Sequence, residues 1–180
     1  LVEVRITSSK WAFHTDNTNV SSMFYGTENL RTLVMDNISY WGNNFSLLNK
    51  MSLGSAYSPL LTFVSLQNWK IFFTSAFEDT GQLKSFFSGL KKVKTLTLNK
   101  FLSVIGTEED QAKIDMTGLF TGLIYLEYIN VEGWETPNVT NMSQLFLNLY
   151  DLQTIAGLGS WDTSNVTNMS YMFMGCANLK

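Results

Sequence analysis

The sequence is poor in the side chains on which most enzymes and metal sites depend. It has one histidine (His14), one cysteine (Cys176), and charged residues at only 15% of its positions. A single cysteine forms no intrachain disulfide, and without a histidine–cysteine cluster there is no zinc site of the usual kind. No Gly-x-Gly-x-x-Gly or P-loop spacing is present to bind phosphate. We therefore expect neither catalysis nor a metal nor a cofactor.

Other absences concern nucleic acid and membranes. The net charge is −3, so the chain lacks the polycationic character that binding to a phosphate backbone needs. Lysines cluster at Lys91, Lys92 and Lys94, and a solvated face explains three lysines better than a phosphate track does. No apolar run reaches the roughly 18 residues of a membrane span. We expect no nucleic-acid binding and no membrane insertion.

What the sequence has instead is an internal repeat. A pair of apolar residues is followed by a short turn and then by another apolar residue seven positions after the first. The units are Met23-Phe24-Tyr25-Gly26 with Leu30, Phe86-Phe87-Ser88-Gly89 with Val93, Leu119-Phe120-Thr121-Gly122 with Leu126, Leu145-Phe146-Leu147-Asn148 with Leu152, Met172-Phe173-Met174-Gly175 with Leu179, and a degenerate unit around Met51-Ser52-Leu53-Gly54. The second members of the pairs are 28, 35, 33, 26 and 27 residues apart. Such periods are typical of a solenoid.

Each unit continues with the pattern Leu-x-x-Leu-x-Leu, which predicts a strand. It stands at 30–35, 61–66, 93–98 and 126–131, and it slips by one residue at 152–158. Alternation of apolar and polar positions is the period of a strand with one buried face. One such strand buries too little apolar surface to be stable alone. We therefore expect neighbouring units to pair their strands in parallel and to stack their leucines into one core.

An aromatic residue follows each predicted strand. Trp69, Phe101 and Trp134 stand three residues beyond the strand pattern, and Trp41 and Trp161 follow at slightly different offsets. A stacked core explains such a series better than a sugar-binding platform does. A buried indole needs an acceptor for its N–H group, and we expect a loop carbonyl to supply it.

The remaining part of each unit has the spacing of a short helix. Apolar residues stand at Val166, Met169, Met172 and Phe173 in the last unit, and at Val139, Met142, Leu145 and Phe146 in the unit before it. Such positions share one face of a helix, with Asp162, Thr163 or Ser164 as its N-cap and Gly175 in a left-handed turn at its end. The sequence thus predicts an α/β fold, a leucine-rich-repeat solenoid with a parallel β-sheet on the concave face and short helices on the convex face.

Two insertions lengthen the middle units, one within 71–82 and one within 103–115. In the second, Thr107 and Asp110 have capping-box spacing with Asp in place of Glu. Glu108, Glu109 and Asp110 lack the alternating ligand spacing of a calcium loop. A solvated helix N-terminus is therefore the preferred interpretation of this acidic trio.

Two segments carry a family resemblance. Residues 134–143 (Trp-Glu-Thr-Pro-Asn-Val-Thr-Asn-Met-Ser) and 161–173 (Trp-Asp-Thr-Ser-Asn-Val-Thr-Asn-Met-Ser-Tyr-Met-Phe) closely resemble the BspA-like leucine-rich repeats, also known as a Mycoplasma and Lactobacillus surface-protein repeat of unknown function. The motif is tight over residues 134–180 and looser upstream. The resemblance implies a bacterial protein that is secreted or attached to the cell wall and that adheres to host glycoproteins or to other cells. It transfers no catalytic residue.

These observations lead to one functional hypothesis and two rivals. We expect residues 1–180 to form a single solenoid domain of about six irregular repeats, as a fragment of a longer surface protein. In the strand pattern the third and fifth residues point away from the core. They define a candidate ligand-binding surface of Thr32, Val34, Phe63, Ser65, Thr95, Thr97, Tyr128, Asn130, Thr154 and Ala156. The expected partner is a host or cell-surface protein or glycoprotein. The rivals are a structural spacer and, more remotely, a glycan-active enzyme.

Overall fold

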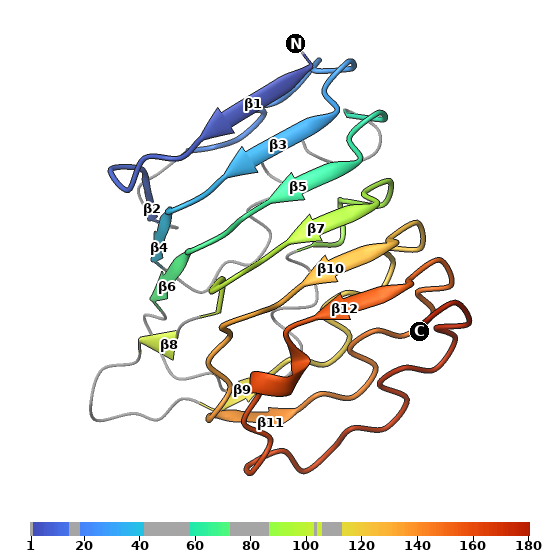
Figure 1. The fold of residues 1–180 in the computed structure, drawn as a ribbon. Coiled ribbons are helices and arrows are strands. Elements are labelled where there is room, and N and C mark those ends of the chain that lie inside the picture. The colour runs from blue at the N-terminus through green and yellow to red at the C-terminus, as the bar shows by residue number, and fades with distance from the viewer. Residues whose placement is uncertain (1, 15–18, 42–57, 73–86, 103, 106–112) are drawn as a thin grey trace.

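A computed structural model describes residues 2–14, 19–41, 58–72, 87–102, 104–105 and 113–180. In these ranges the backbone winds into a parallel β-solenoid whose turns stack from the N-terminal to the C-terminal end (Figure 1). The strands are β1 (Glu3–Ile6), β2 (Ala12–His14), β3 (Thr32–Met35), β4 (Ser39–Trp41), β5 (Phe63–Ser65), β6 (Lys70–Phe72), β7 (Thr95–Thr97), β8 (Val104–Ile105), β9 (Ile114–Asp115), β10 (Tyr128–Asn130), β11 (Val139–Asn141) and β12 (Thr154–Ala156). A 3₁₀ helix, η2 (Leu158–Ser160), follows β12.

The predicted strands form a single parallel sheet. Its order is β1-β3-β5-β7-β10-β12, so each strand pairs with that of the next turn. The pairing is in register from Glu3 through Thr32, Phe63 and Thr95 to Tyr128 and Thr154. A parallel pair needs a long crossover connection, and here one whole turn of the solenoid supplies it. The parallel sheet predicted from the strand pattern is confirmed.

The leucines of the pattern fill the interior of the stack. Leu33, Val64, Leu96 and Ile129 lie one above another along the sheet and are completely buried. Leu30, Leu61, Val93, Leu126 and Leu152 form a second buried row at the start of the pattern. Each row gains its cover from the turns above and below, as expected of a solenoid whose units are stable only together.

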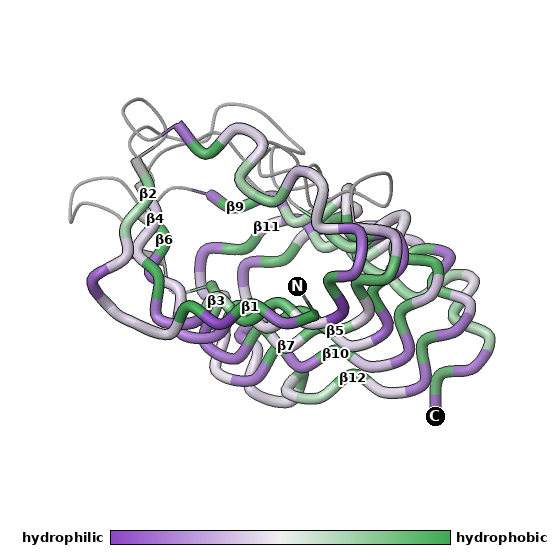
Figure 2. The backbone as a smooth tube through the Cα atoms, turned by 90° about the horizontal axis from the view of Figure 1, so that it is seen from above, coloured by the Kyte–Doolittle hydropathy of each residue, from purple (hydrophilic) through white to green (hydrophobic). Residues whose placement is uncertain are grey.

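A second sheet was not foreseen from the sequence. β2, β4, β6 and β8 pair in parallel along another side of the turns, and β9 pairs with β11. Seen along the stack, the six-stranded sheet lies on one side, with β2, β4 and β6 on a second (Figure 2). Buried Phe13, Tyr40 and Ile71 occupy the middle positions of β2, β4 and β6 and are contiguous with the main core.

The aromatic residues form two parallel stacks. One runs through Trp69, Phe101, Trp134 and Trp161, with ring centroids 5.5, 6.1 and 5.7 Å apart. The other runs through Phe87, Phe120, Phe146 and Phe173, at 5.4, 5.2 and 5.4 Å. Such distances suit offset or tilted aromatic pairs. The interpretation of the first series as core is confirmed, and Trp41 stands in β4.

The expected indole partners are also present. The indole N–H of Trp69 donates to the carbonyl of Met35, and that of Trp134 donates to the carbonyl of Leu98 at 2.6 Å. Both acceptors belong to the preceding turn, where Met35 ends β3 and Leu98 directly follows β7. The indole N–H of Trp161 is buried without a partner among the described residues. Main-chain carbonyls therefore satisfy two of these indoles, and the predicted loop carbonyl is found for Trp134, whereas Trp69 bonds to a strand residue.

The prediction of short helices on the convex face is wrong. In the described ranges the only helical element is η2, and the segments at 116–124, 142–149 and 169–176 are successive tight turns. Each contains two residues in the left-handed region, four positions apart: Gly118 and Gly122, Gln144 and Asn148, Tyr171 and Gly175. A left-handed residue in mid-segment ends an α-helix, so apolar residues spaced by three and four here mark turns.

In these tight turns, backbone N–H groups donate hydrogen bonds to the neighbouring turn of the solenoid. The amides of Gln144 and Phe146 donate to the carbonyls of Ser170 and Met172, both at 2.9 Å, in the following turn. An α-helix would have used these N–H groups internally. The Asp162 carboxylate accepts from the Ser164 amide at 2.9 Å. Hydrogen bonding to the Ser164 side chain, and then to this amide, lowers the pKa of Asp162. Asp162 therefore stabilises a turn instead of capping a helix, while Gly175 is left-handed as expected.

Some expectations fall outside the described residues. The degenerate unit at 51–54, the acidic trio at 108–110 and most of both insertions belong to this group. Of the insertions the structure describes only the end of β6, then β8, Lys113 and β9.

Gly157 explains why the last strand pattern slips by one residue. Gly157 is left-handed (φ 97°), and a Cβ there would lie 2.3 Å from the backbone nitrogen of Glu132, so only glycine fits.

Candidate functional site

The candidate surface consists of two rows of outward side chains on the six-stranded sheet, here called the sheet face. The first row contains Glu3, Thr32, Phe63, Thr95, Tyr128 and Thr154, and the second contains Arg5, Val34, Ser65, Thr97, Asn130 and Ala156. Every binding residue proposed from the sequence lies in one of these rows. Their roles in binding stay predictions, but the parallel register brings them onto one continuous surface.

Phe63 and Tyr128 are the large members of the first row. Both are half-buried, and Thr95 of the strand between them is also half-buried. Neighbouring strands lie about 4.8 Å apart, so the two aromatic side chains start from backbone positions about 10 Å from each other. The stiffness of a paired strand fixes this separation before any partner arrives. The sheet face therefore offers two preorganised aromatic anchors with a hydroxyl group between them.

Two residues of the second row are less available than their positions predict. Val34 is 3% exposed and Ser65 is 2% exposed. The Ser65 hydroxyl donates to the Asp36 carboxylate at 2.7 Å, and Gln67 donates to Ser65 through its side chain (3.0 Å) and to Asp36 through its backbone (2.8 Å). Residues that follow the strands thus fold back over this part of the row. Val34 and Ser65 face away from the core but offer a ligand almost no surface.

The middle of the second row has an unpaired hydroxyl group. Thr97 Oγ1 is buried and has no hydrogen-bond partner among the described residues. Its neighbour Asn130 uses its side-chain oxygen to accept from the Glu132 amide at 2.9 Å. A buried hydroxyl without a partner carries a free-energy penalty. The Thr97 hydroxyl thus lies in the second row but, like Ser65, exposes almost no surface to a ligand.

Charges lie at the edges of the sheet face. At the start of the strands Lys94 Nζ lies 2.6 Å from Glu127 Oε1, and Glu3 pairs with Arg5 on β1. The Glu127 carboxylate raises the pKa of Lys94. Because these pairs are largely exposed, they contribute little to stability. Between β3 and β10 neither row contains a charged residue.

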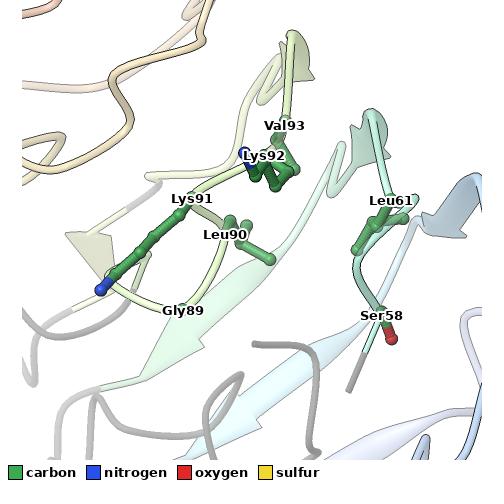
Figure 3. A pocket seen from close by; sticks show the side chains of 7 residues that line it. All are labelled: Ser58, Leu61, Gly89, Leu90, Lys91, Lys92 and Val93. Atoms are coloured by element: carbon green, nitrogen blue, oxygen red, sulfur yellow. The ribbon is translucent and has the colours of Figure 1, made fainter. Parts of the chain in front are cut away.

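Two hollows among the described residues lie away from the sheet face. One, of about 270 Å³, is lined by Asn68, Trp69, Lys70, Lys100, Gly133 and Glu135. The other lies between two turns at Ser58, Leu61 and residues 89–93 (Figure 3) and leaves no space even for a water molecule. Lys91, Lys92 and Lys94 are exposed, and Lys92 lies 4.1 Å from the centre of the Tyr125 ring. This agrees with a solvated face for the lysines.

Groups suited to metal or acid–base chemistry do not converge in the described ranges. No three His, Cys, Asp or Glu side chains come together there as a metal site would require. Cys176 is half-buried at the edge of the core, and its thiol lies 3.0 Å from the Phe146 carbonyl. His14 belongs to β2. Within the same ranges no helix is long and apolar enough to cross a membrane.

Comparison with known proteins finds similarity to a family model over part of the chain and to a solved structure. The family model described as "Mycoplasma protein of unknown function, DUF285" matches residues 114–180. No curated protein matches the chain. Among solved structures, the chain is similar to one in the Toll–Spätzle complex from Drosophila, with 17% identity and a TM-score of 0.39. The match covers 87% of this chain and 23% of that one, so the chain spans less than a quarter of that protein's length. The family match includes the two segments in which the repeat motif is tightest.

Proposed function

We propose that this chain is a protein-binding module of an extracellular bacterial surface protein, and that the sheet face is its adhesive surface. The observation that carries the proposal is the register of the six parallel strands. It aligns Phe63, Thr95 and Tyr128 on one rigid surface. Aromatic side chains surrounded by small polar residues are typical anchors of protein interfaces. The partner is a host or cell-surface protein or glycoprotein, and binding requires neither catalysis nor a cofactor.

Rigidity supports this use of the surface. The strands are held on both sides by neighbouring turns, and the core behind them is completely buried at Leu33, Val64, Leu96 and Ile129. A surface that is ordered before binding loses little conformational entropy in the complex.

The test is a double variant, Phe63→Ala with Tyr128→Ala, compared with Tyr150→Ala. Tyr150 is an exposed aromatic residue outside the two rows of the sheet face. Labelled protein is titrated onto cultured epithelial cells, with trypsin-treated cells as a control for protein receptors. We expect the double variant to weaken binding by about 30-fold or more, and Tyr150→Ala to leave it unchanged.

The main alternative is a structural spacer that carries an adhesive domain located elsewhere. The continuous aromatic stacks favour it, because they stiffen the solenoid from Trp69 to Phe173. Cell binding that survives the double variant, in a protein whose circular dichroism spectrum is unchanged, would replace the proposed function with the spacer.

A further inference from the structure

The larger of the two hollows, here called the corner hollow, lies where the chain turns from β5 towards β6 (Figure 1). It has a volume of about 270 Å³. Its lining comes from three successive turns of the solenoid and consists of Asn68, Trp69, Lys70, Lys100, Gly133 and Glu135. Trp69 belongs to the buried aromatic stack, whereas the four polar residues are exposed. The corner hollow therefore has a rim of amide, ammonium and carboxylate groups beyond the ends of the strands, outside the sheet face.

The backbone around the corner hollow is fixed by hydrogen bonds between turns. Asn68 and Lys100 occupy equivalent positions, and both are left-handed, with φ 55° and 52°. The Asn68 amide donates to the carbonyl of Asn99, and the Lys100 amide donates to that of Glu132, both at 2.8 Å. The Asn68 side chain donates to Asn37 Oδ1 at 3.1 Å, so its own oxygen remains available as an acceptor. These groups are ordered before any ligand binds.

Gly133 determines where the Lys100 side chain runs. Gly133 is left-handed (φ 72°), and a Cβ there would lie 2.8 Å from Cγ, 3.6 Å from Cε and 3.8 Å from Cδ of Lys100. The aliphatic part of Lys100 thus lies along the backbone of Gly133, where any larger residue would displace it. This contact limits the movement of a long side chain at the rim, and such a restraint lowers the entropy that is lost when the ammonium group binds a ligand.

The charges at the rim do not neutralise one another. Among the described residues Lys70, Lys100 and Glu135 form no ion pair. Lys70 and Glu135 stand two turns apart, so their backbones are separated by about 10 Å. The hollow lies between them. It therefore presents two ammonium groups, whose N–H donors have no acceptor in the described part of the chain, and one carboxylate that can accept hydrogen bonds.

We propose that the corner hollow binds a sugar acid, a monosaccharide that carries a carboxylate, such as a hexuronate. The ligand carboxylate accepts charge-assisted hydrogen bonds from Lys70 and Lys100. Hydroxyl groups of the ring donate to the Glu135 carboxylate and to the Asn68 side-chain oxygen. The volume of the hollow lies near the lower limit of small-molecule sites, which suits one sugar ring. This site does not depend on protein binding at the sheet face.

The test titrates the isotopically labelled protein with glucuronate and follows the amide signals of Asn68, Lys100 and Gly133 by NMR. Lys100→Ala removes one ammonium group and is expected to weaken binding about tenfold or more. Gly133→Ala keeps the charge but displaces the Lys100 side chain, so a similar loss is expected. Lys91→Ala removes the same charge from an exposed lysine outside the corner hollow and leaves binding unchanged. The remaining amide signals report whether each variant is folded.

Three further compounds test the class of ligand. Glucose has the ring without the carboxylate, whereas acetate and glycine have the carboxylate without the ring. We expect glucuronate to bind about tenfold more tightly than each of them. Acetate binding as tightly as glucuronate would mean an adventitious ion only and would overturn the proposal, as would equal or tighter binding of glucose or glycine. Unchanged amide signals with glucuronate, or the same loss in Lys91→Ala as in Lys100→Ala, would also overturn it.

Discussion

Two neighbouring turns, 139–149 and 166–176, have nearly the same apolar residues and very different surroundings. Val139, Met142 and Phe146 are completely buried, whereas Val166 is half-buried and Met169 and Phe173 are exposed. The backbone follows the same path in both, with left-handed residues at equivalent positions. The difference arises from position alone, since the first turn lies between two others and the second has a neighbour on one side. Burial in this fold is therefore a property of the stack and not of the unit.

The largest expected difference between the two turns concerns their phenylalanines. Phe146→Ala removes a completely buried ring between Phe120 and Phe173 and is expected to lower the free energy of unfolding by about 3–5 kcal/mol. Phe173→Ala removes a ring that packs on one side only, and about 1 kcal/mol is expected. Urea denaturation of the two variants measures both values. Equal losses would contradict the one-sided packing of the last turn.

Two left-handed glycines differ in how closely the neighbouring turn approaches them. Gly157 is left-handed, and its Cβ position lies against the backbone of Glu132. Gly26 is also left-handed but has open space around it. We expect Gly157→Ala to cost about 3 kcal/mol, from strain and overpacking together, and Gly26→Ala to cost about 1 kcal/mol. Thermal unfolding distinguishes them, and similar losses would argue against close contact between turns at Gly157.

A smaller difference in stability is expected between variants of Trp134 and Trp161. The indole of Trp134 donates to Leu98, while that of Trp161 has no partner in the described part of the chain. Trp134→Phe loses this hydrogen bond, while the Leu98 carbonyl keeps the bond from the Phe101 amide at 2.9 Å, so a loss of about 1.5 kcal/mol is expected. Trp161→Phe is expected to cost less than about 1 kcal/mol, because no hydrogen bond is lost. Chemical denaturation of both variants tests the order, which would be reversed if Trp161 were the bonded indole.

The smallest effect concerns the only cysteine. Burial raises the pKa of the Cys176 thiol in the folded protein above its ordinary value of 9.0. As the pH rises through 9.0, the unfolded thiol ionises first, so the free energy of unfolding falls until the folded thiol ionises too. We expect stability to decrease less in Cys176→Ala than in the original chain between about pH 7 and about pH 9.5. Equal decreases would place Cys176 in an environment like water.

The sequence predicted the parts of the fold that depend on stacked apolar positions. The strand pattern located β3, β5, β7, β10 and β12, and the spacing of the tryptophans indicated a buried stack with carbonyl partners. It did not predict the turns, because apolar residues three and four apart suit both a helix and two successive tight turns. The feature that distinguishes the two is a pair of left-handed residues four positions apart. The sequence indicates such a pair where both positions are glycine, as at Gly118 and Gly122, but not where one of them is a tyrosine, as at Tyr171.

The sequence predicted which residues lie on the outer side of the sheet, but not how exposed each of them is. Alternation along a strand showed that Val34 and Ser65 face away from the core, and the structure agrees. The alternation contains no information about Asp36 and Gln67, which lie beyond the strands and cover Ser65 through hydrogen bonds. The second sheet escaped prediction for a related reason. Its strands are two or three residues long, too short for a pattern of alternation to stand out.

Hydrogen exchange of single amides tests the stacked-turn architecture most directly. The amides of Gln144 and Phe146 donate to the following turn, and those of Tyr171 and Phe173 have no acceptor among the described residues. We predict slow exchange for Gln144 and Phe146 and fast exchange for Tyr171 and Phe173. Equal protection of both pairs would mean that each unit satisfies its own backbone, as a helix does, and would contradict a stack held together by bonds between turns.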